Sequence, residues 1–481
     1  MEILFIFTTI IITIAISIFV KRRSVIEFFS VLTALVVLFE SGAIALKVSS
    51  VGNYTPFGLF SVDSLAVIIL LVISFINLTV AIYSIAYLRQ ETAKNIIGFT
   101  RVRQYFTLLN TFLLAMILAI GANNPILAWI SVEATTLSTA FLISFYNKPS
   151  AIEGAWKYLI INSVGLLLGF FGTMLYFTAV KFPNESGLID WQLLLSSSSQ
   201  LNPLVAKIAF VFVLVGYGTK VGLAPMHTWK PDAYSKAPNP IGALLSGALL
   251  PIAFMIILKF KRITDAAVGQ GFSQHLLIVF GLLSIVIAAL IMFNALNYKR
   301  LLAYSSIENA GVMALGFGFG GMGALAAILH LIYHSLVKGA MFFSSGNLLL
   351  KYSSARIANI KGATNVAPIT STLFIVGFLV VTGVPPFGIF LTKMQILSAG
   401  IESYPLISII ALFFTLLVFV GFLKHTLAMF FGEKPKGIEV GENNIWLILP
   451  PILLLTSIII LSFYIPSFLS ALINDASVIY K

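Results

Sequence analysis

The sequence predicts an all-α polytopic membrane protein, and three observations favour this fold class. Of the 481 residues, 59% are hydrophobic and only 10% are charged, and the mean hydropathy is +1.03. Soluble globular proteins contain about 25% charged residues, so water is not the main solvent of this chain. Apolar runs of roughly 20 residues recur along the sequence, and each is long enough to cross a bilayer as a helix. A membrane β-barrel would instead show alternating segments of about ten residues.

About fourteen segments have the length and composition of transmembrane helices. The first is followed by Lys21-Arg22-Arg23. A secretory signal carries its positive charge before the apolar stretch, so we expect this segment to be a retained helix. The loops are short, and no soluble domain interrupts the array. The expected spans are 3–20, 24–46, 60–88, 104–122, 124–146, 153–180, 204–228, 238–262, 274–297, 300–318, 321–350, 368–399, 404–431 and 443–468.

Basic residues predict the orientation of these spans. Loops after odd-numbered spans hold about eighteen Lys and Arg residues, and loops after even-numbered spans hold about five. Cytoplasmic loops of membrane proteins are enriched in Lys and Arg, so we expect a multi-pass protein of the cytoplasmic membrane with both termini outside. The cluster Lys259-Phe260-Lys261-Arg262 lies on the opposite side from this pattern.

Composition also excludes several kinds of site. The chain has no cysteine, which removes iron–sulfur ligation, thiolate zinc and disulfides. Its five histidines are scattered, so we expect no metal and no other cofactor on this chain, and any electron carrier belongs to a partner. The net charge of +12 forms no basic stripe on a soluble face, so nucleic acid is not an expected partner.

Two short matches indicate an internal repeat. Ala128–Ala134, which contains Glu133, resembles Tyr304–Ala310 about 175 residues later, and Thr219-Lys220 recurs as Thr392-Lys393 after about 173 residues. The offset covers five spans, an odd number, so the two halves would lie inverted in the membrane, as in many secondary transporters. We therefore expect N-terminal helices 1–3 in 1–103, one five-helix repeat in 104–262, a second in 274–431 and a final helix in 443–481.

Glycine and proline interrupt two of the spans beside a lysine. Gly222 and Pro225 follow Lys220, and Pro385-Pro386 precedes Lys393. Proline removes a backbone donor and clashes with the preceding turn, so both helices are expected to be broken. Irregular backbone inside a bilayer persists only where protein shields it or where it lines a hydrated cavity. The breaks therefore favour a functional interior.

Glu133 and Lys220 are the first candidate functional residues. Both are expected deep inside apolar spans, where a charge costs about 2.5–3.5 kcal/mol even on insertion scales. A nearby carboxylate keeps a lysine charged, whereas desolvation favours its neutral form. The pair therefore has the chemistry of a proton store that a moving charge triggers. The alternative is a static buried ion pair that stabilises one arrangement of helices.

His330, His334 and Lys338 follow one another at four-residue spacing and are expected to stack on one face of a helix. Imidazole titrates near neutral pH and can pass a proton between its two nitrogens, so this stripe is a candidate relay. A metal site is the alternative, but no carboxylate or third histidine joins the stripe.

Lys393 and Glu308 complete the candidate set. Lys393 follows the Pro-Pro break and is the expected exit residue, with snorkelling to an interface as the alternative. Glu308 is closer to the expected helix start, so three roles stay open for it: a helix cap, a point of proton uptake at the cytoplasmic mouth, or a direct part in transport. The sequence thus predicts the movement of protons or sodium ions along titratable side chains in the membrane interior.

Three long motifs resemble a known family. They are Gly216-Tyr217-Gly218-Thr219-Lys220-Val221-Gly222-Leu223-Ala224-Pro225-Met226-His227-Thr228-Trp229-Lys230-Pro231-Asp232-Ala233, then Lys299-Arg300-Leu301-Leu302-Ala303-Tyr304-Ser305-Ser306, and the stretch from His330 to Lys338. The chain resembles the antiporter-like subunits of complex I, of Mrp sodium/proton antiporters and of membrane-bound hydrogenases. The context of Glu133 and Glu308 is most similar to the hydrogenase (formate hydrogenlyase) branch.

The resemblance implies a fold and residue roles. The family has fourteen core helices with two inverted five-helix repeats. Its pattern implies that Glu133 is the fifth-helix glutamate, Lys220 the seventh-helix lysine and Lys393 the twelfth-helix lysine. His330, His334 and Lys338 match the central histidine and lysine connection. Two departures stand out, because Leu249-Leu250-Pro251-Ile252 lacks the central lysine that many members carry on the eighth helix, and Lys230 and Tyr234 replace residues that are usually Leu and His.

Three functional hypotheses follow. The leading one is an ion-translocating subunit of a redox complex such as a membrane-bound hydrogenase or an NADH dehydrogenase-like complex. Its expected partners are other membrane subunits, including further antiporter-like ones, iron–sulfur and nickel–iron subunits, and lipid. The second is a redox-free Mrp-type cation/proton antiporter. The third is a membrane scaffold without transport, in which buried Lys and His could be replaced by Leu or Met without loss. A stand-alone enzyme is not expected, because no nucleophile–base arrangement is evident.

Overall fold

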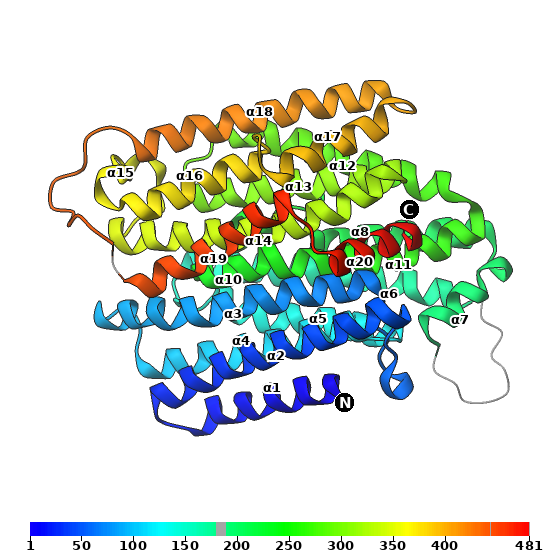
Figure 1. Ribbon diagram of the computed structural model, residues 1–481, viewed down its shortest axis with the longest axis horizontal. Helices are drawn as coiled ribbons and strands as arrows, with labels where there is room; N and C mark the ends of the chain where they lie inside the picture. The colour runs from blue at the N-terminus through cyan, green and yellow to red at the C-terminus, as the bar shows by residue number, and fades with distance from the viewer. Residues whose placement is uncertain (179–188, 443, 481) are drawn as a thin grey trace.

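The computed structural model describes residues 1–178, 189–442 and 444–480. Within these residues the regular structure is helical, and most helices run side by side along the long axis of the molecule (Figure 1). The N-terminus and the end of the last helix lie at the same end of this bundle. Residues 179–180 of the sixth predicted span and residue 443 of the fourteenth lie outside the described residues.

The first half of the chain forms helices close to the predicted spans. Their bounds are α1 Glu2–Phe19, α2 Arg23–Val51, α3 Ser64–Ala93, α4 Phe99–Gly121, α5 Pro125–Ile143, α6 Pro149–Phe177, α7 Trp191–Ser196, α8 Pro203–Val221, α9 Trp229–Lys236, α10 Asn239–Leu244 and α11 Leu250–Val268. The five residues between α10 and α11, Leu245–Leu249, form a π-helical segment, so that 239–268 is one long interrupted span.

The second half continues the bundle. Its helices are α12 Gln270–Met292, α13 Tyr298–Phe319, α14 Met322–Tyr352, α15 Ala363–Val366, α16 Pro368–Thr382, α17 Gly388–Ile401, α18 Pro405–Phe430, α19 Ile445–Phe463 and α20 Ser467–Ile479. Short helix α20 follows the last predicted span and packs against α3 and α14.

Twelve helical stretches among the described residues are long and apolar enough to cross a membrane. The two other predicted spans correspond to α13, and to α16 and α17 together. Helix α13 has 22 residues but includes Lys299, Arg300 and Glu308, which lower its hydropathy. Helices α16 and α17 have only 15 and 14 residues each, because a break divides them. The all-α polytopic fold class is therefore confirmed.

Both predicted breaks are present, and the helices that precede them end in the same way. Helix α8 ends at Gly222, which has φ +80°, and α16 ends at Gly383, which has φ +81°. Glycine adopts this left-handed conformation without steric cost, so it is the usual residue after a helix end. Lys220 lies just before the first break, whereas Lys393 lies in the helix after the second.

The two helices that carry the glutamates each begin with a capping asparagine. Asn124 Oδ1 accepts hydrogen bonds from the first backbone amides of α5, at 2.7 and 3.1 Å. Asn297 Oδ1 does the same for α13, at 2.8 and 3.4 Å. An asparagine at this position satisfies amides that have no partner inside the helix. These caps set where α5 and α13 begin, and hence where Glu133 and Glu308 lie along the bundle.

Glycines let α6 and α8 approach closely. A Cβ atom on Gly216 of α8 would lie 2.5 Å from the backbone nitrogen of Gly169 on α6, and one on Gly165 would lie 2.7 Å from Thr219 Cβ. Small residues at such a crossing allow close backbone contact between transmembrane helices. The contact places Tyr158 of α6 within reach of Lys220 of α8.

The interior of the bundle is built around α10–α11 and α14. The most apolar stretch of the 239–268 span is entirely buried, and that of α14 is almost entirely buried, whereas the outer helices α1 and α18 expose most of theirs. Helix α14 contacts α3, α10, α13, α16, α17 and α19. Side chains on the 239–268 span and on α14 are therefore enclosed on nearly all sides by other helices.

Candidate functional site

Six of the seven predicted residues are buried in the interior of the bundle. The exposed fraction is 1% for Lys220, 3% for Lys393 and 0% for the other four, which are Glu308, His330, His334 and Lys338. Glu133 is half-buried. Lys393 is buried within α17 and does not extend to the surface, so the snorkelling alternative for Lys393 is wrong. Charged side chains at such depth need partners, and the partners define the site.

Lys220 is held by hydroxyl groups from two helices. Its Nζ donates to Thr136 Oγ1 of α5 at 2.7 Å and to the Tyr158 hydroxyl of α6 at 2.8 Å, and it lies 5.0 Å from the centre of the Tyr158 ring. The Tyr158 hydroxyl also bonds Thr139 at 2.7 Å. Lys220 lies in the last turn of α8, where a cation interacts favourably with the helix dipole.

Glu133 makes no direct ion pair with Lys220. Its carboxylate accepts a hydrogen bond from Ser163 of α6 at 2.6 Å and one from Thr136 at 3.4 Å. Thr136 lies one turn further along α5 and therefore stands between the carboxylate and the ammonium group. The predicted couple is thus bridged by a hydroxyl group, and the alternative of a static buried ion pair is wrong. We call Glu133, Thr136, Tyr158, Ser163 and Lys220 the first cluster.

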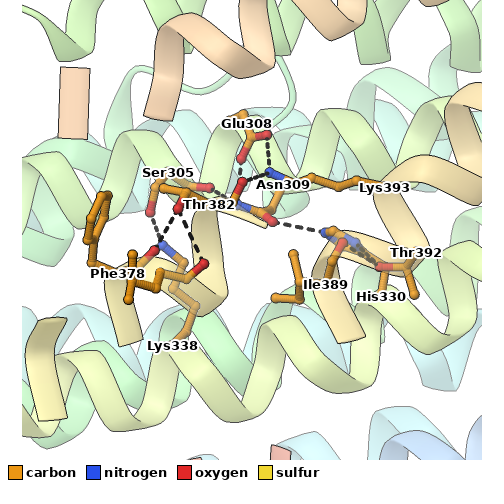
Figure 2. Close-up of polar contacts among 11 residues, drawn as sticks. Ser305, Glu308, Asn309, His330, Lys338, Phe378, Thr382, Ile389, Thr392 and Lys393 are labelled. Carbon is orange, nitrogen blue, oxygen red and sulfur yellow. Dashed lines mark hydrogen bonds and ion pairs between the residues drawn. The ribbon is translucent and has the colours of Figure 1, made fainter. Parts of the chain in front are cut away.

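The second half of the chain does contain a buried ion pair. Lys393 Nζ lies 2.8 Å from Glu308 Oε1, and it also donates to the backbone oxygen of Thr382, the last residue of α16, at 3.3 Å (Figure 2). Glu308 lies in the middle of α13 and is fully buried. The expectation that it lies near a helix start, as a cap or at a cytoplasmic mouth, is therefore wrong, because α13 begins at Tyr298.

Asn309 connects this pair to His330. Its Nδ2 donates to Glu308 Oε2 at 2.6 Å, and its Oδ1 lies 2.9 Å from His330 Nε2 (Figure 2). The other ring nitrogen, His330 Nδ1, lies 2.9 Å from Thr392 Oγ1 of α17. Residues from α13, α14 and α17 thus form one network. Asn309 was not predictable from the sequence, since a lone asparagine beside a glutamate matches no pattern.

Lys338 joins the same network at its other end. Its Nζ donates to the Leu302 backbone oxygen at 2.9 Å and to Ser305 Oγ, and the Ser305 backbone oxygen accepts from Asn309 Nδ2 at 2.7 Å. Figure 2 shows Ser305 between Lys338 and Asn309. We call Ser305, Glu308, Asn309, His330, Lys338, Thr392 and Lys393 the second cluster.

His334 is the exception on the predicted ladder. It is fully buried between His330 and Lys338 on α14, but neither of its ring nitrogens has a hydrogen-bond partner among the described residues. The contacts from Lys338 to His330 instead run through Ser305 and Asn309 of α13. The three residues lie on one helix as predicted, but they do not form a direct chain from one ring to the next.

Nothing in the described part of the chain groups three or more His, Cys, Asp or Glu side chains closely enough to hold a metal ion. The chemistry available to the two clusters is therefore that of hydroxyl, carboxylate, ammonium and imidazole groups. These groups exchange protons, and their charges respond to one another across a medium of low dielectric constant. Such an arrangement can store a proton and release it when a neighbouring charge changes.

Comparisons with known proteins identify the family of this chain. The family described as NADH:quinone oxidoreductase/Mrp antiporter, TM, matches residues 122–419, and the one described as NADH-Ubiquinone oxidoreductase (complex I), chain 5 N-terminus, matches residues 50–95. A hydrogenase-4 component F homolog from Methylacidiphilum infernorum is 36% identical over 73% of this chain and 75% of its own length. Na(+)/H(+) antiporter subunit A1 from Staphylococcus aureus is 28% identical over 86% of this chain, which spans about half, 53%, of that protein.

Solved structures share the fold. A chain of the membrane-bound sulfane sulfur reductase, an archaeal respiratory membrane complex, has a TM-score of 0.88 at 22% identity, over 100% of this chain and 98% of that one. A chain of the Mrp complex from Dietzia sp. gives 0.85 at 18% identity, over 100% and 97%. A chain of respiratory complex I from Thermus thermophilus gives 0.77 at 20% identity, over 96% and 97%. The chain belongs to the NADH:quinone oxidoreductase/Mrp antiporter family, whose members are antiporter-like membrane subunits.

Proposed function

We propose that this chain moves protons across the membrane as the antiporter-like subunit of a multi-subunit redox complex of the hydrogenase type. The observation that carries the proposal is the second cluster, in which a fully buried Glu308–Lys393 ion pair is linked by Asn309 to a buried histidine. Burying ionisable side chains inside a bilayer costs free energy, and such residues usually mark an ion pathway. The similarity to a hydrogenase-4 component F homolog supports the redox assignment.

The two clusters supply the steps. In the first cluster, Thr136 transmits the field of Glu133 to Lys220, so a charge that changes near Glu133 alters how firmly Lys220 holds its proton. In the second cluster, Glu308 keeps Lys393 charged, and separating the two groups lets Lys393 release its proton. A proton taken up on the cytoplasmic side would pass from Lys220 by way of the α14 residues to Lys393 and leave outside. The reverse direction would drive the redox step.

Partners provide the electron chemistry in this proposal. Iron–sulfur and nickel–iron subunits would hold the electron carriers, and further antiporter-like subunits would lie alongside this chain in the membrane. Of the two charged residues in the first cluster, Lys220 is buried and Glu133 is half-buried, which makes Glu133 the residue through which a neighbouring subunit would act. Purification of the native complex followed by mass identification of its subunits tests this assignment.

A second candidate is a subunit of a redox-free cation/proton antiporter. The observation that favours it is the similarity to Na(+)/H(+) antiporter subunit A1 over 86% of this chain. In that case purification would recover small membrane proteins without iron or nickel, and sodium would affect transport directly. Proton uptake measured in sodium-free and sodium-containing vesicles therefore separates the two candidates.

We also propose the orientation inferred from the basic loops, with both termini outside the cytoplasmic membrane. The N-terminus and the end of α20 lie at one end of the bundle (Figure 1), which is consistent with this topology. Because the chain has no cysteine, single substitutions report sidedness without background. A membrane-impermeant maleimide added outside intact cells should label Asn53→Cys and not Ala358→Cys. The opposite pattern would reverse the orientation.

Replacing Lys220 tests the transport proposal directly. In vesicles that contain the reconstituted complex, Lys220→Ala should abolish proton uptake coupled to electron transfer, because the first cluster then has no proton to release. Assembly of the complex should be unchanged, since Thr136 and Tyr158 keep their other hydrogen-bond partners. Uptake at the unaltered rate would remove Lys220 from the pathway.

A further inference from the structure

Lys230 is a second buried lysine at the first break, and neither cluster includes it. It lies in the first turn of α9, its side chain is 0% exposed, and its Nζ donates to the backbone oxygen of Val221, the last residue of α8, at 2.6 Å. A Cβ atom on Gly222 would lie 2.8 Å from Lys230 Cδ, so this glycine leaves the space that the lysine side chain occupies.

Lys230 occupies the position at the first break that Lys393 occupies at the second. Each lysine lies in the helix after its break and donates to the backbone oxygen of the last residue before it, Val221 or Thr382. Each also fills the space beside the left-handed glycine, since a Cβ on Gly383 would lie 3.0 Å from Lys393 Cδ. The pairing of Lys220 with Lys393 by sequence offset is therefore not the structural one.

The partners of the two lysines differ in one respect. Lys393 is paired with Glu308, whereas no carboxylate of the described residues forms an ion pair with Lys230. An ammonium group buried without a carboxylate is costly, and desolvation favours the neutral amine. A lysine whose charged and neutral forms are closer in free energy is suited to accept a proton and pass it on.

Lys230 also lies between the two halves of the bundle. Its Nζ is 5.7 Å from the centre of the Tyr234 ring, and Tyr234 donates to the Leu245 backbone oxygen in the π-helical segment of the eighth span. Tyr234 also packs edge-on against Phe342 of α14, with 5.6 Å between the ring centres. Within the described part of the chain, the two buried ring nitrogens of His334 have no hydrogen-bond partner. The π-helical segment leads directly into Leu250-Pro251, where no lysine is present.

We propose that Lys230 carries protons from the first cluster to His334, in place of a lysine on the eighth span; this inference rests on the proposed function. Lys220 gives one proton to the neutral amine of Lys230 and becomes neutral itself. The ammonium group of Lys230 then gives one proton to a ring nitrogen of His334. The opposite ring nitrogen releases its proton to the neutral amine of Lys338. Each step moves one proton and one positive charge, and no other reactant takes part.

Three substitutions at this position separate proton transfer from a structural role. If Lys230 only caps α8 with a positive charge, Lys230→Arg should preserve proton uptake and Lys230→His should preserve less of it. If Lys230 carries protons, the order reverses, because arginine keeps its proton in proteins and histidine exchanges it near neutral pH. Lys230→Leu should lose about 100-fold in the rate of proton uptake, a typical loss for a missing acid–base group.

The measurement is proton uptake coupled to electron transfer by the whole complex in vesicles, at matched amounts of assembled complex. Lys299→Arg is the matched control, because Lys299 is also buried and donates to one backbone oxygen, that of Ala237, at 2.6 Å. We expect Lys230→His to exceed Lys230→Arg and the control to match the unaltered complex. An equal or higher rate for Lys230→Arg, normal uptake by Lys230→Leu, or an equal loss in the control would overturn the proposal.

The same experiment distinguishes this inference from the function on which it rests. The unaltered complex and Lys220→Ala are measured in the same vesicles. If the unaltered complex moves protons and Lys220→Ala does not, the proposed function stands whatever the Lys230 variants do. If the unaltered complex moves no protons, the proposed function itself fails.

Discussion

The two clusters use the same kinds of residue in opposite ways. In the second cluster, Glu308 and Lys393 are both buried and meet at 2.8 Å. In the first cluster, Glu133 is half-buried and reaches Lys220 only through Thr136. Protein surrounds the ion pair of the second cluster, so its two charges stay together. In the first cluster the carboxylate of Glu133 is partly exposed, so a charge outside the bundle acts on it more easily.

This difference indicates that the two clusters have different roles. A buried ion pair contributes little net stability but is costly to break, so it changes state only when a substantial force separates its members. A lysine held by hydroxyl groups responds to smaller changes in its surroundings, because no fixed countercharge outweighs them. The first cluster is thus suited to sense a charge, and the second to gate release. Three predictions test the comparison.

The largest expected effect is on stability in the second cluster. Glu308→Ala leaves Lys393 buried without its countercharge and should lower the stability of the complex by about 3–5 kcal/mol. Glu133→Ala should lower the stability of the complex by less than about 1 kcal/mol, because removing the half-buried carboxylate leaves no ion-pair partner without its countercharge. Thermal denaturation of the purified complex measures both values.

A double substitution controls for cavity formation at Glu308. Glu308→Leu with Lys393→Met replaces the pair by apolar side chains and should recover most of the stability while proton uptake stays lost. Equal losses of stability for Glu308→Ala and Glu133→Ala would contradict the contrast between the buried ion pair of the second cluster and the partly exposed Glu133 of the first.

A smaller effect separates the two histidines of α14. His330→Leu removes partners from Asn309 and Thr392 and should cost about 1–3 kcal/mol, the usual penalty for buried polar groups left unsatisfied. His334→Leu breaks no hydrogen bond in the structure, so stability should hold or rise while proton uptake falls. Denaturation and uptake are compared on the same preparations. Unchanged uptake with His334→Leu would place this residue outside the pathway.

The smallest effect concerns the hydroxyl bridge in the first cluster. Thr136→Val keeps the shape of the side chain and removes the hydrogen bonds to Lys220 and Glu133, at a cost of about 1 kcal/mol in stability. The rate of proton uptake should fall by about fivefold, which is the factor that a rise of about 1 kcal/mol in the barrier to transfer produces. Thr136→Ser retains the hydroxyl group and serves as the control. If Val and Ser behave alike, Glu133 acts on Lys220 without the bridge.

Much of the fold was predictable because the membrane imposes simple rules. Lengths of apolar sequence predicted the spans, and Gly222, Gly383 and the neighbouring prolines predicted both breaks. Charged residues inside apolar spans were predicted to face inward, and Lys220 and Lys393 do so. Their partners were not predictable in this way. Asn309, Thr136 and Tyr158 are common residue types, and nothing in their local sequence shows that another helix brings a charge within 3 Å of them.

The amino-acid sequence by itself determined the all-α membrane fold, the burial of Lys220 and Lys393 and the positions of the two breaks. Each of these depends on hydropathy and backbone chemistry that act within one segment. Only the tertiary structure decided that Glu308 pairs with Lys393, that Glu133 stops short of Lys220, and that Lys230 rather than Lys220 is the counterpart of Lys393. The physical reason is that these contacts join side chains from different helices, so they depend on how the helices pack and not on the spacing within any one of them.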